Sequence, residues 1–159
     1  YIGAQDISPF ASGAYTGEVN ANQIKEFAQY AIIGHSERRK YFREDDEMLI
    51  KKVRMALAEG IIPIFCVASA DTFIPEGVEL VAYEPLFAIG SGKADTPEDA
   101  EEIARAIKEK NADVKTVIYG GSVNPENVHS FTSMPSVDGV LPGGASLDTQ
   151  KFTQLITNA

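Results

Sequence analysis

The sequence predicts an α/β fold whose parallel sheet is buried on both faces. Short apolar segments alternate with helical or loop segments along almost the whole chain. The apolar segments are continuous rather than alternating between apolar and polar, which is typical of parallel strands buried on both sides. Nearly every apolar segment ends in a polar or glycine-rich cluster. These observations together favour repeated strand–helix units in a single sheet.

Length and composition narrow the classes of function. The 159 residues suit one domain, no linker divides them, and 44% hydrophobic with 23% charged residues is ordinary for a globular protein. The net charge of −9 argues against binding to nucleic acid or to an anionic membrane surface, although it allows an anionic substrate. No apolar run approaches the roughly 18 residues of a membrane span, and no secretion signal is visible. A single cysteine, Cys66, excludes an internal disulfide and predicts a reducing, cytoplasmic location.

The first elements follow from local signals. Residues 1–5 are predicted to form a strand, although the chain opens on it without a methionine. A loop with glycines at both ends follows at 12–17. Asn20 is a suitable cap for a short helix that carries Ile24 and Phe27 at helical spacing.

The middle of the chain contains two further strands, at 30–34 and 61–67. Between them, the acidic residues 45–47 begin a helix that Gly60 ends. This helix places three apolar residues on one face: Leu49, Val53 and Leu57. Residues 69–76 show no helical pattern and are predicted to form a loop.

The remaining strands are expected at 78–83, 114–119 and 137–141. Thr96 and Pro97 form a strong helix start, because threonine caps a helix and proline suits its first position. The inward face of this helix is predicted to carry Ala100, Ile103, Ala104 and Ile107. A short helix is expected to start at Asn124, and a last helix carries Phe152, Leu155 and Ile156.

Polar groups gather where the predicted strands end. In parallel α/β folds, ligands bind beyond the carboxyl ends of the strands, so these groups are expected to converge. They are Gln5-Asp6, His35-Ser36-Glu37, Glu84, Gly120-Gly121-Ser122 and Gly143-Gly144.

Glu84 is the candidate general base. It follows an apolar strand directly, and partial desolvation raises the pKa of a carboxyl group towards the range that a base needs. The alternative is an ordinary solvated carboxylate. His35 could act as an acid, a base or a neutral hydrogen-bond donor, with Glu37 two residues further on, or it could be structural.

The two glycine pairs suit a phosphate group, because glycine lets backbone N–H groups approach an anion at a helix N-terminus. The alternative is that each pair consists of ordinary turn glycines. Cys66 is interpreted as a small buried hydrophobe without a basic neighbour, and His129 as surface or core filler. The basic residues 38–40 are interpreted as a solvated helix start or as ion-pair partners.

Collinear motifs then identify a family. They are Gly3-Ala4-Gln5, residues 13–19 (GAYTGEV), residues 33–39 (IGHSERR), Ala82-Tyr83-Glu84-Pro85 through Gly90-Ser91-Gly92-Lys93, residues 119–123 (YGGSV) and residues 143–147 (GGASL). Together they resemble the triosephosphate isomerase family over almost the whole chain.

The resemblance implies a (β/α)₈ TIM barrel that interconverts dihydroxyacetone phosphate and D-glyceraldehyde 3-phosphate by proton transfer through an enediolate. This reaction belongs to glycolysis and gluconeogenesis and uses no metal and no organic cofactor. The implied partners are a small phosphorylated triose and further copies of the chain, with Thr16 inserted into a neighbouring subunit. By resemblance, Glu84 is the base, His35 polarises the substrate oxygens, and Ser36 and Glu37 support the site.

The same resemblance assigns a lid and a phosphate site. Residues 85–93 correspond to a lid that closes over the substrate, and Ile89 and Leu141 hold Glu84 in apolar surroundings. The lid and latch residues are Pro85, Phe87, Ile89, Gly92, Lys93, Tyr119 and Leu141. The residues that hold the phosphate are Gly90, Gly121, Ser122, Gly143 and Gly144. Ser122 also resembles a latch residue.

The chain departs from the family pattern in several ways. The family's first two βα units, with an Asn-x-Lys motif, are absent from these residues, and no lysine aligns with that motif; Lys93 is a poor substitute. The helix expected at 68–77 has shrunk, Phe87 replaces a tryptophan, and Pro142 replaces a valine where it could disturb the last strand. We therefore expect one truncated domain, 1–159, with about six strands in an incomplete or open barrel.

Three origins of this truncation stay open: a segment preceding Tyr1, pairing of the sheet edges with another chain, or a fragment with a rearranged barrel. The functional alternatives are an inactive barrel that binds phosphate or serves in assembly, and another barrel isomerase acting on a phosphosugar.

Overall fold

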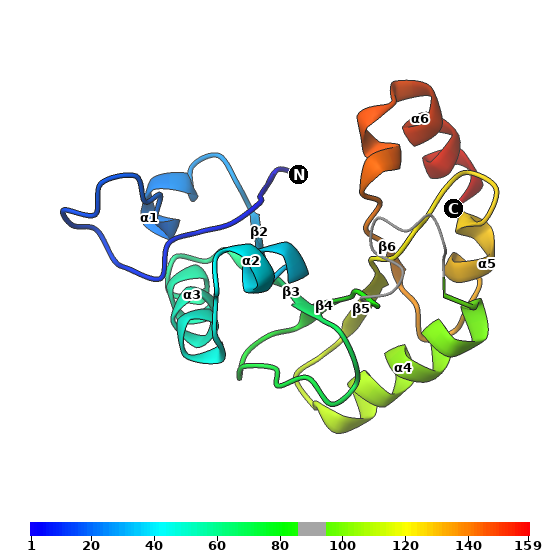
Figure 1. Cartoon of the computed structure of the whole chain (residues 1–159), viewed down its shortest axis with the longest axis horizontal. Helices are drawn as coiled ribbons and strands as arrows, with labels where there is room; N and C mark the ends of the chain where they lie inside the picture. Colours follow the sequence, from blue (N-terminus) through cyan, green and yellow to red (C-terminus); the bar gives the residue numbers. More distant parts are fainter. Residues whose placement is uncertain (86–94) are drawn as a thin grey trace.

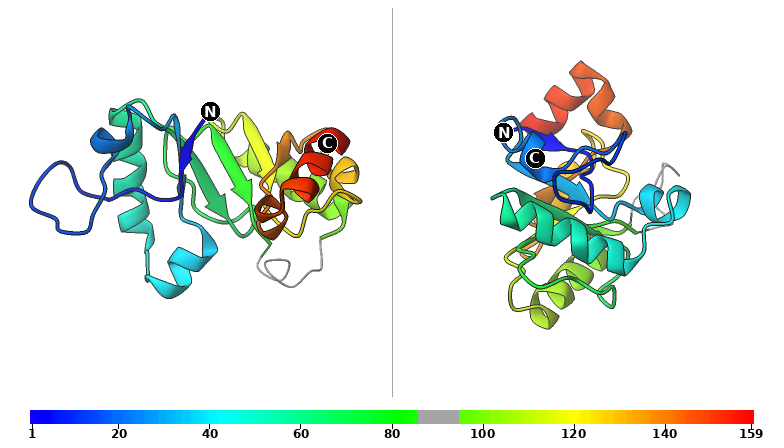
Figure 2. Two further views of the ribbon diagram at one scale, coloured as in Figure 1. Left: turned by 90° about the horizontal axis from the view of Figure 1, so that it is seen from above. Right: turned by 90° about the vertical axis from the view of Figure 1, so that its left-hand side faces the viewer.

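A parallel sheet forms the centre of the chain (Figure 1). The computed structural model describes residues 1–85 and 95–159. Within these residues, six strands lie side by side in sequence order and all point the same way (Figure 2). The strands are β1 (Gly3–Ala4), β2 (Tyr30–Ile33), β3 (Ile62–Val67), β4 (Leu80–Tyr83), β5 (Thr116–Tyr119) and β6 (Gly139–Val140).

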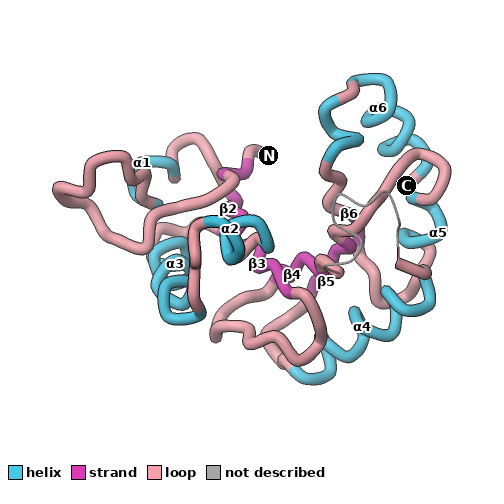
Figure 3. The backbone as a smooth tube through the Cα atoms, in the orientation of Figure 1, coloured by secondary structure: helices cyan, strands magenta, loops and turns pink. Residues whose placement is uncertain are grey.

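The helices follow the strands in the predicted alternation. They are α1 (Ala21–Ile24), α2 (Ser36–Tyr41), α3 (Asp46–Ala58), α4 (Pro97–Lys110), α5 (Val128–Thr132), the 3₁₀ helix η1 (Gly144–Leu147) and α6 (Thr149–Asn158). The sheet curves into an arc, and α3, α4 and α5 pack along its outer side (Figure 3). The end strands β1 and β6 do not pair, so the arc stays open. The predicted α/β fold and the incomplete barrel are both confirmed.

The hydrophobic core lies between the sheet and the outer helices. From the strands it receives Phe65, Val81 and Val117, which are at most 1% exposed. Helices α3 and α4 add Leu49, Val53, Ala104 and Ile107. The central strands β3, β4 and β5 are therefore the most deeply buried part of the sheet.

Three predicted helix caps are present. Asn20 and Gln23 form a capping box at α1, in which each side chain accepts the other residue's backbone N–H. Asp45 accepts the N–H of Met48 at 2.9 Å, and Thr96 accepts the N–H of Asp99 at 3.1 Å. These local signals explain why the starts of α1, α3 and α4 could be predicted.

Several predicted core residues lie at the surface. Phe27 is 67% exposed because α1 ends at Ile24, before the next turn could bury it. Leu57, Phe152 and Ile156 are also exposed, and α6 is covered by η1 and α5 on one side only. The helix expected at Asn124 begins at Val128 instead. The Asn124 side chain accepts the N–H groups of Glu126 and Asn127, which closes a turn first.

The connection between β3 and β4 is a loop without a helix, as predicted. Ile74, Pro75 and Val78 pack inward from this loop. Ion pairs from Lys110 to Asp71 and from Lys115 to Glu79 tie it to α4 and β5. The shortened connection thus covers the sheet with its own apolar side chains.

A buried charge network joins the segment after β1 to α2 and α3. Lys52 is 2% exposed, and its Nζ lies 2.7 Å from Asp6 Oδ1 and 2.6 Å from Glu44 Oε1. Arg38 completes the network through the same two carboxylates. Burial raises the pKa of Asp6, partly offset by Lys52. Arg38 is therefore an ion-pair partner, one of the two roles predicted for it.

No helix in the described ranges is long and apolar enough to cross a membrane.

Arg43 gives a test of backbone strain. Its φ of +57° lies in the left-handed region, where a β-carbon is unfavourable. Because glycine tolerates this conformation, we expect Arg43→Gly to raise the free energy of unfolding by about 0.5–1 kcal/mol, after part of the gain is lost to unfolded-chain entropy. Urea unfolding measures the effect.

The matched control is Arg43→Ala, which removes the guanidinium group but keeps the β-carbon. We expect it to give no comparable gain. Equal stabilisation by both variants would show that the effect comes from charge rather than from the backbone.

Candidate active site

Glu84 lies at the carboxyl end of the central strand β4. Its backbone N–H donates to Val67 O at the end of β3, at 2.8 Å. On the other side, Gly120 N–H donates to Tyr83 O at 2.7 Å. The sheet register therefore places Glu84 between the ends of β3 and β5, and it is only 2% exposed.

Three neighbours contact the Glu84 carboxylate. The Ser36 backbone N–H donates to Oε2 at 3.3 Å, and His35 Nε2 lies 3.3 Å from Oε1. The Cys66 thiol also forms a hydrogen bond with it. Burial raises the pKa of Glu84, and His35, Cys66 and Ser36 offset part of this rise. The direction agrees with the sequence prediction.

The contact with Cys66 was not predicted. The thiol was interpreted as apolar filling, and it is indeed 1% exposed. Burial, together with the neighbouring Glu84, raises the pKa of Cys66 well above its usual range. The group is therefore a protonated donor. Its contact with Glu84 depends on the alignment of β3 with β4, which the sequence pattern does not reveal.

His35 is oriented by the start of α2. Gly34 precedes it with φ +78°, a conformation that glycine adopts easily, and this turn aims the chain from β2 into the helix. His35 Nδ1 accepts the backbone N–H of Glu37 at 3.3 Å. A neutral imidazole bound in this way carries its proton on Nε2, the nitrogen that faces Glu84. The Glu37 carboxylate is exposed and lies 3.9 Å from Nδ1.

A cavity of about 810 Å³ brings most of the predicted site residues together. It extends from the carboxyl ends of β2 and β4 to the glycine-rich segments that follow β5 and β6. The predicted residues in its wall are His35, Glu37, Glu84, Gly121, Ser122, Leu141, Gly143 and Gly144. The expected convergence at the carboxyl edge of the sheet is therefore present.

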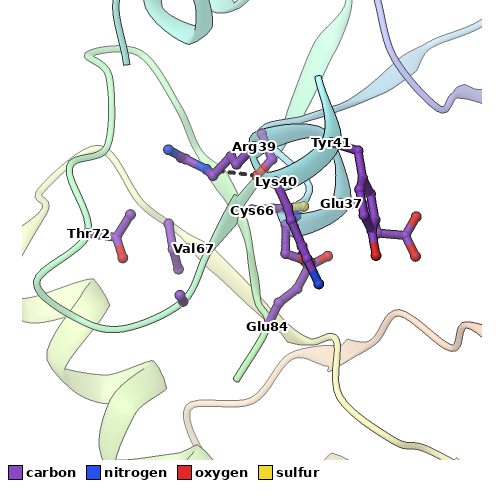
Figure 4. A pocket seen from close by; sticks show the side chains of 11 residues that line it. Glu37, Arg39, Lys40, Tyr41, Cys66, Val67, Thr72 and Glu84 are labelled. Atoms are coloured by element: carbon purple, nitrogen blue, oxygen red, sulfur yellow. Dashed lines mark hydrogen bonds between the residues drawn. The ribbon is translucent and has the colours of Figure 1, made fainter. Parts of the chain in front are cut away.

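A second cavity, of about 780 Å³, lies beside the start of α2 (Figure 4). Ser36, Cys66 and Glu84 line it, with Arg39 and Thr72 at its far side. Arg39 donates to Gly34 O at 3.0 Å, the bond drawn in Figure 4. Glu84 contributes to both cavities and thus separates them.

The two glycine pairs have different physical causes. A β-carbon on Gly120 would lie 2.9 Å from Glu84 Cγ, and one on Gly121 would collide with the Tyr119 hydroxyl. Packing alone therefore requires glycine after β5. In contrast, a β-carbon on Gly143 or Gly144 would meet no atom within 4 Å. Only the second pair leaves open space that a ligand could use.

Tyr119 contacts the residue that follows the predicted lid. Its hydroxyl accepts the Asp95 backbone N–H at 2.8 Å, and the Tyr83 hydroxyl donates to Asp95 Oδ2 at 3.1 Å. Burial raises the pKa of both tyrosines. This position fits the predicted latch, and Pro85 is buried directly after Glu84.

Five predicted residues lie outside the described ranges: Phe87, Ile89, Gly90, Gly92 and Lys93.

The expected disturbance by Pro142 is absent. Strand β6 ends at Val140, and the last bond of this edge runs from Leu141 N–H to Tyr119 O at 2.8 Å. Because Pro142 follows that bond, it removes no donor from the sheet. Leu141 lines the large cavity, as predicted, and its clamping of Glu84 stays a prediction.

The comparisons with known proteins decide the family. The family model for triosephosphate isomerase matches residues 1–74 and 76–159. The chain belongs to the triosephosphate isomerase family. The resemblance seen in the sequence motifs is thereby confirmed.

Individual relatives agree with this assignment. A triosephosphate isomerase of Thermus thermophilus is 42% identical over 186 residues, which cover 97% of this chain and 74% of the relative. Triosephosphate isomerases of Mesomycoplasma hyopneumoniae (strain 7448) and Corynebacterium efficiens are each 40% identical, over 99% of this chain and 74% and 72% of the relatives. Within the matched region, the relatives are longer than this chain, since the Thermus alignment spans more positions than the chain has residues.

One residue of the large cavity was missed by the sequence analysis. Lys151 lies in the first turn of α6 and lines the cavity together with Gly143 and Gly144. The available signal was a basic residue at a helix start shortly after a glycine pair.

Paired glycine substitutions test the two physical causes. We expect Gly121→Ala to destabilise the fold by about 1–3 kcal/mol, because the new methyl group forces the Tyr119 ring to move. Gly143→Ala, with open space and φ −82°, should change stability by less than about 0.5 kcal/mol. Thermal or urea unfolding measures both; equal costs would contradict this distinction.

The raised pKa of Glu84 predicts a pH dependence of stability. The folded chain holds this proton more tightly than the unfolded chain, so the stabilisation is present at low pH and is lost as the pH rises through the folded-state pKa. We therefore expect Glu84→Gln to be more stable than the parent at neutral pH, by about 1.4 kcal/mol for each pKa unit of the shift.

The difference should vanish below the pKa of an unfolded glutamate. Urea unfolding between acidic and neutral pH measures it, with the exposed Glu126→Gln as control. A parent and a Glu84→Gln variant with parallel pH profiles would show that burial does not disfavour the Glu84 carboxylate.

Proposed function

We propose that this chain interconverts dihydroxyacetone phosphate and D-glyceraldehyde 3-phosphate by proton transfer through an enediolate. The observation that carries the proposal is the juxtaposition of a buried carboxylate, Glu84, with His35 Nε2 at 3.3 Å in one cavity. The same cavity reaches the open glycine pair after β6. A base, a polarising donor and room for a phosphate thus face one space.

Glu84 is the proposed base. It removes a proton from the carbon beside the carbonyl group of the substrate and returns it to the neighbouring carbon. Because burial raises its pKa, the carboxylate accepts the substrate proton more readily than a solvated glutamate would. Ser36 N–H fixes one carboxylate oxygen and leaves the oxygen near His35 to face the substrate.

His35 is the proposed electrophile. The Glu37 backbone N–H occupies Nδ1, so Nε2–H is available to donate to the substrate carbonyl oxygen. This hydrogen bond strengthens as charge develops on the oxygen in the enediolate. A neutral histidine beside a glutamate base is established chemistry of this family. The proposed reaction uses protein groups and calls for no metal or organic cofactor.

The phosphate end of the substrate is proposed to lie at Gly143 and Gly144, beside η1 and the start of α6. Gly90, Gly121 and Ser122 are proposed to contribute from the facing segments. Tyr119 would hold the closed lid through Asp95, and closure would exclude water from the enediolate.

We further propose a cytoplasmic homo-oligomer acting in glycolysis and gluconeogenesis. The loop that contains Thr16 presents a stacked pair of exposed rings, Phe10 and Tyr15, with centroids 4.4 Å apart. Exposed stacked aromatics of this kind suit a protein–protein contact.

The second candidate is an inactive barrel that binds phosphate or serves in assembly. It is favoured by the open sheet and by the absence of a lysine aligned with the family's Asn-x-Lys motif. This candidate retains anion binding without turnover.

An isomerase assay on the native polypeptide separates the two candidates. We expect turnover of dihydroxyacetone phosphate, and a loss of about 10²- to 10⁴-fold in kcat for Glu84→Gln, because the variant lacks the base. Glu126→Gln removes an exposed carboxylate outside the cavity and should retain parental activity. Background turnover by the parent, with phosphate still bound, would favour the inactive barrel; turnover of other sugar phosphates in its place would favour a different isomerase.

A further inference from the structure

Lys151 places a positive charge at the glycine-rich end of the large cavity. Asp148 caps α6 by accepting the backbone N–H groups of Gln150 and Lys151, at 2.9 and 3.0 Å. This cap fixes the first turn of the helix. The Lys151 side chain lines the cavity that also contains Glu84, Gly143 and Gly144.

The cavity is otherwise acidic. Its described wall contains the carboxylates of Glu37, Glu84 and Asp148, and Lys151 is the one lysine or arginine among those wall residues. A phosphate group that enters this space therefore meets net negative charge from the side chains. Without Lys151, only backbone N–H groups and helix dipoles would oppose the repulsion.

The charge of Lys151 is not engaged elsewhere in the described parts of the chain. Lys52 is held by two carboxylates, and the exposed lysines on α1's flank, α3, α4 and β5's flank each have one carboxylate partner. Within residues 1–85 and 95–159, Lys40 and Lys151 are the lysines without an ion pair, and Lys40 lines the other cavity. Lys151 is therefore free to neutralise a ligand.

We propose that Lys151 supplies the side-chain charge that binds the phosphate group of the substrate in this cavity. Two features of the same end support it: the open space at Gly143 and Gly144, and the N-terminus of the ten-residue helix α6, which adds potential of the same sign. A lysine ammonium group acts on phosphate as a compact charge with several donors. The choice of a triose phosphate as ligand rests on the proposed function, whereas anion binding by Lys151 does not require turnover.

Inorganic phosphate is the probe for the test. We expect Lys151→Met to weaken phosphate binding about 10- to 100-fold at fixed ionic strength, because a charge-assisted contact is lost. Lys151→Arg should retain most of the affinity. The matched control is Lys51→Met, which removes the same side chain from the exposed face of α3, where it pairs with Glu47. Titration calorimetry gives the dissociation constants, and urea unfolding confirms that each variant folds.

Unchanged phosphate affinity in a folded Lys151→Met variant would overturn the proposal, as would a parent chain that does not bind phosphate. An equal loss in Lys51→Met would also overturn it, since the effect would then be net charge alone. With the triose phosphate as substrate, Lys151→Met should raise KM by a similar factor.

The failure of this inference and that of the proposed function are distinguishable. Phosphate binding that depends on Lys151, without turnover, would remove the isomerase function and leave the phosphate site. Turnover that depends on Glu84, with KM and phosphate affinity unaffected by Lys151→Met, would remove the role of Lys151 and leave the isomerase function.

Discussion

The burial of one carboxylate governs the arrangement around it. Glu84 ends the central strand and is almost completely removed from water, which is costly for a charged group unless donors surround it. The donors come from different elements: Ser36 N–H from the start of α2, the Cys66 thiol from β3 and His35 from the end of β2. On the β5 side, only a glycine at position 120 lets the backbone approach closely enough. The strand ends on both sides of Glu84 are thus shaped by a group whose ionised form the fold disfavours.

The sequence predicted what depends on local signals and one-dimensional pattern. The order of the strands, the caps at Asn20, Asp45 and Thr96, and the meeting of His35 with Glu84 all follow from such signals. It failed where neighbours in space decide the outcome. Phe27 and Ile156 have the spacing of core residues, yet their helices are too short or too little covered to bury them. The contact between Cys66 and Glu84 depends on strand register, and Lys151 looks like any lysine on a surface helix.

The two glycine pairs show why similar motifs need separate physical explanations. Both follow a strand and both precede a helical segment, so the sequence treats them alike. After β5 the missing side chains make room for Glu84 and Tyr119, which are parts of the protein itself. After β6 nothing in the described chain fills the space, and Lys151 lines the same cavity. If Lys151 binds phosphate, the charge comes from the last helix of the chain, whereas the family pattern takes it from a first strand that these residues lack.

The sequential order of the strands has a consequence for how the molecule loses its structure. Each strand pairs only with those before and after it in the chain, as in a stack of repeats whose stability is the sum of nearest-neighbour terms. Such a stack can open from its ends in separate steps, since no strand bridges the first unit to the last. The two-residue strands β1 and β6 form those ends, whereas the deeply buried β3, β4 and β5 form the middle. Amide exchange should therefore be fastest at the ends of the sheet and slowest around Glu84, so that the base outlasts the glycine-rich segment after β6.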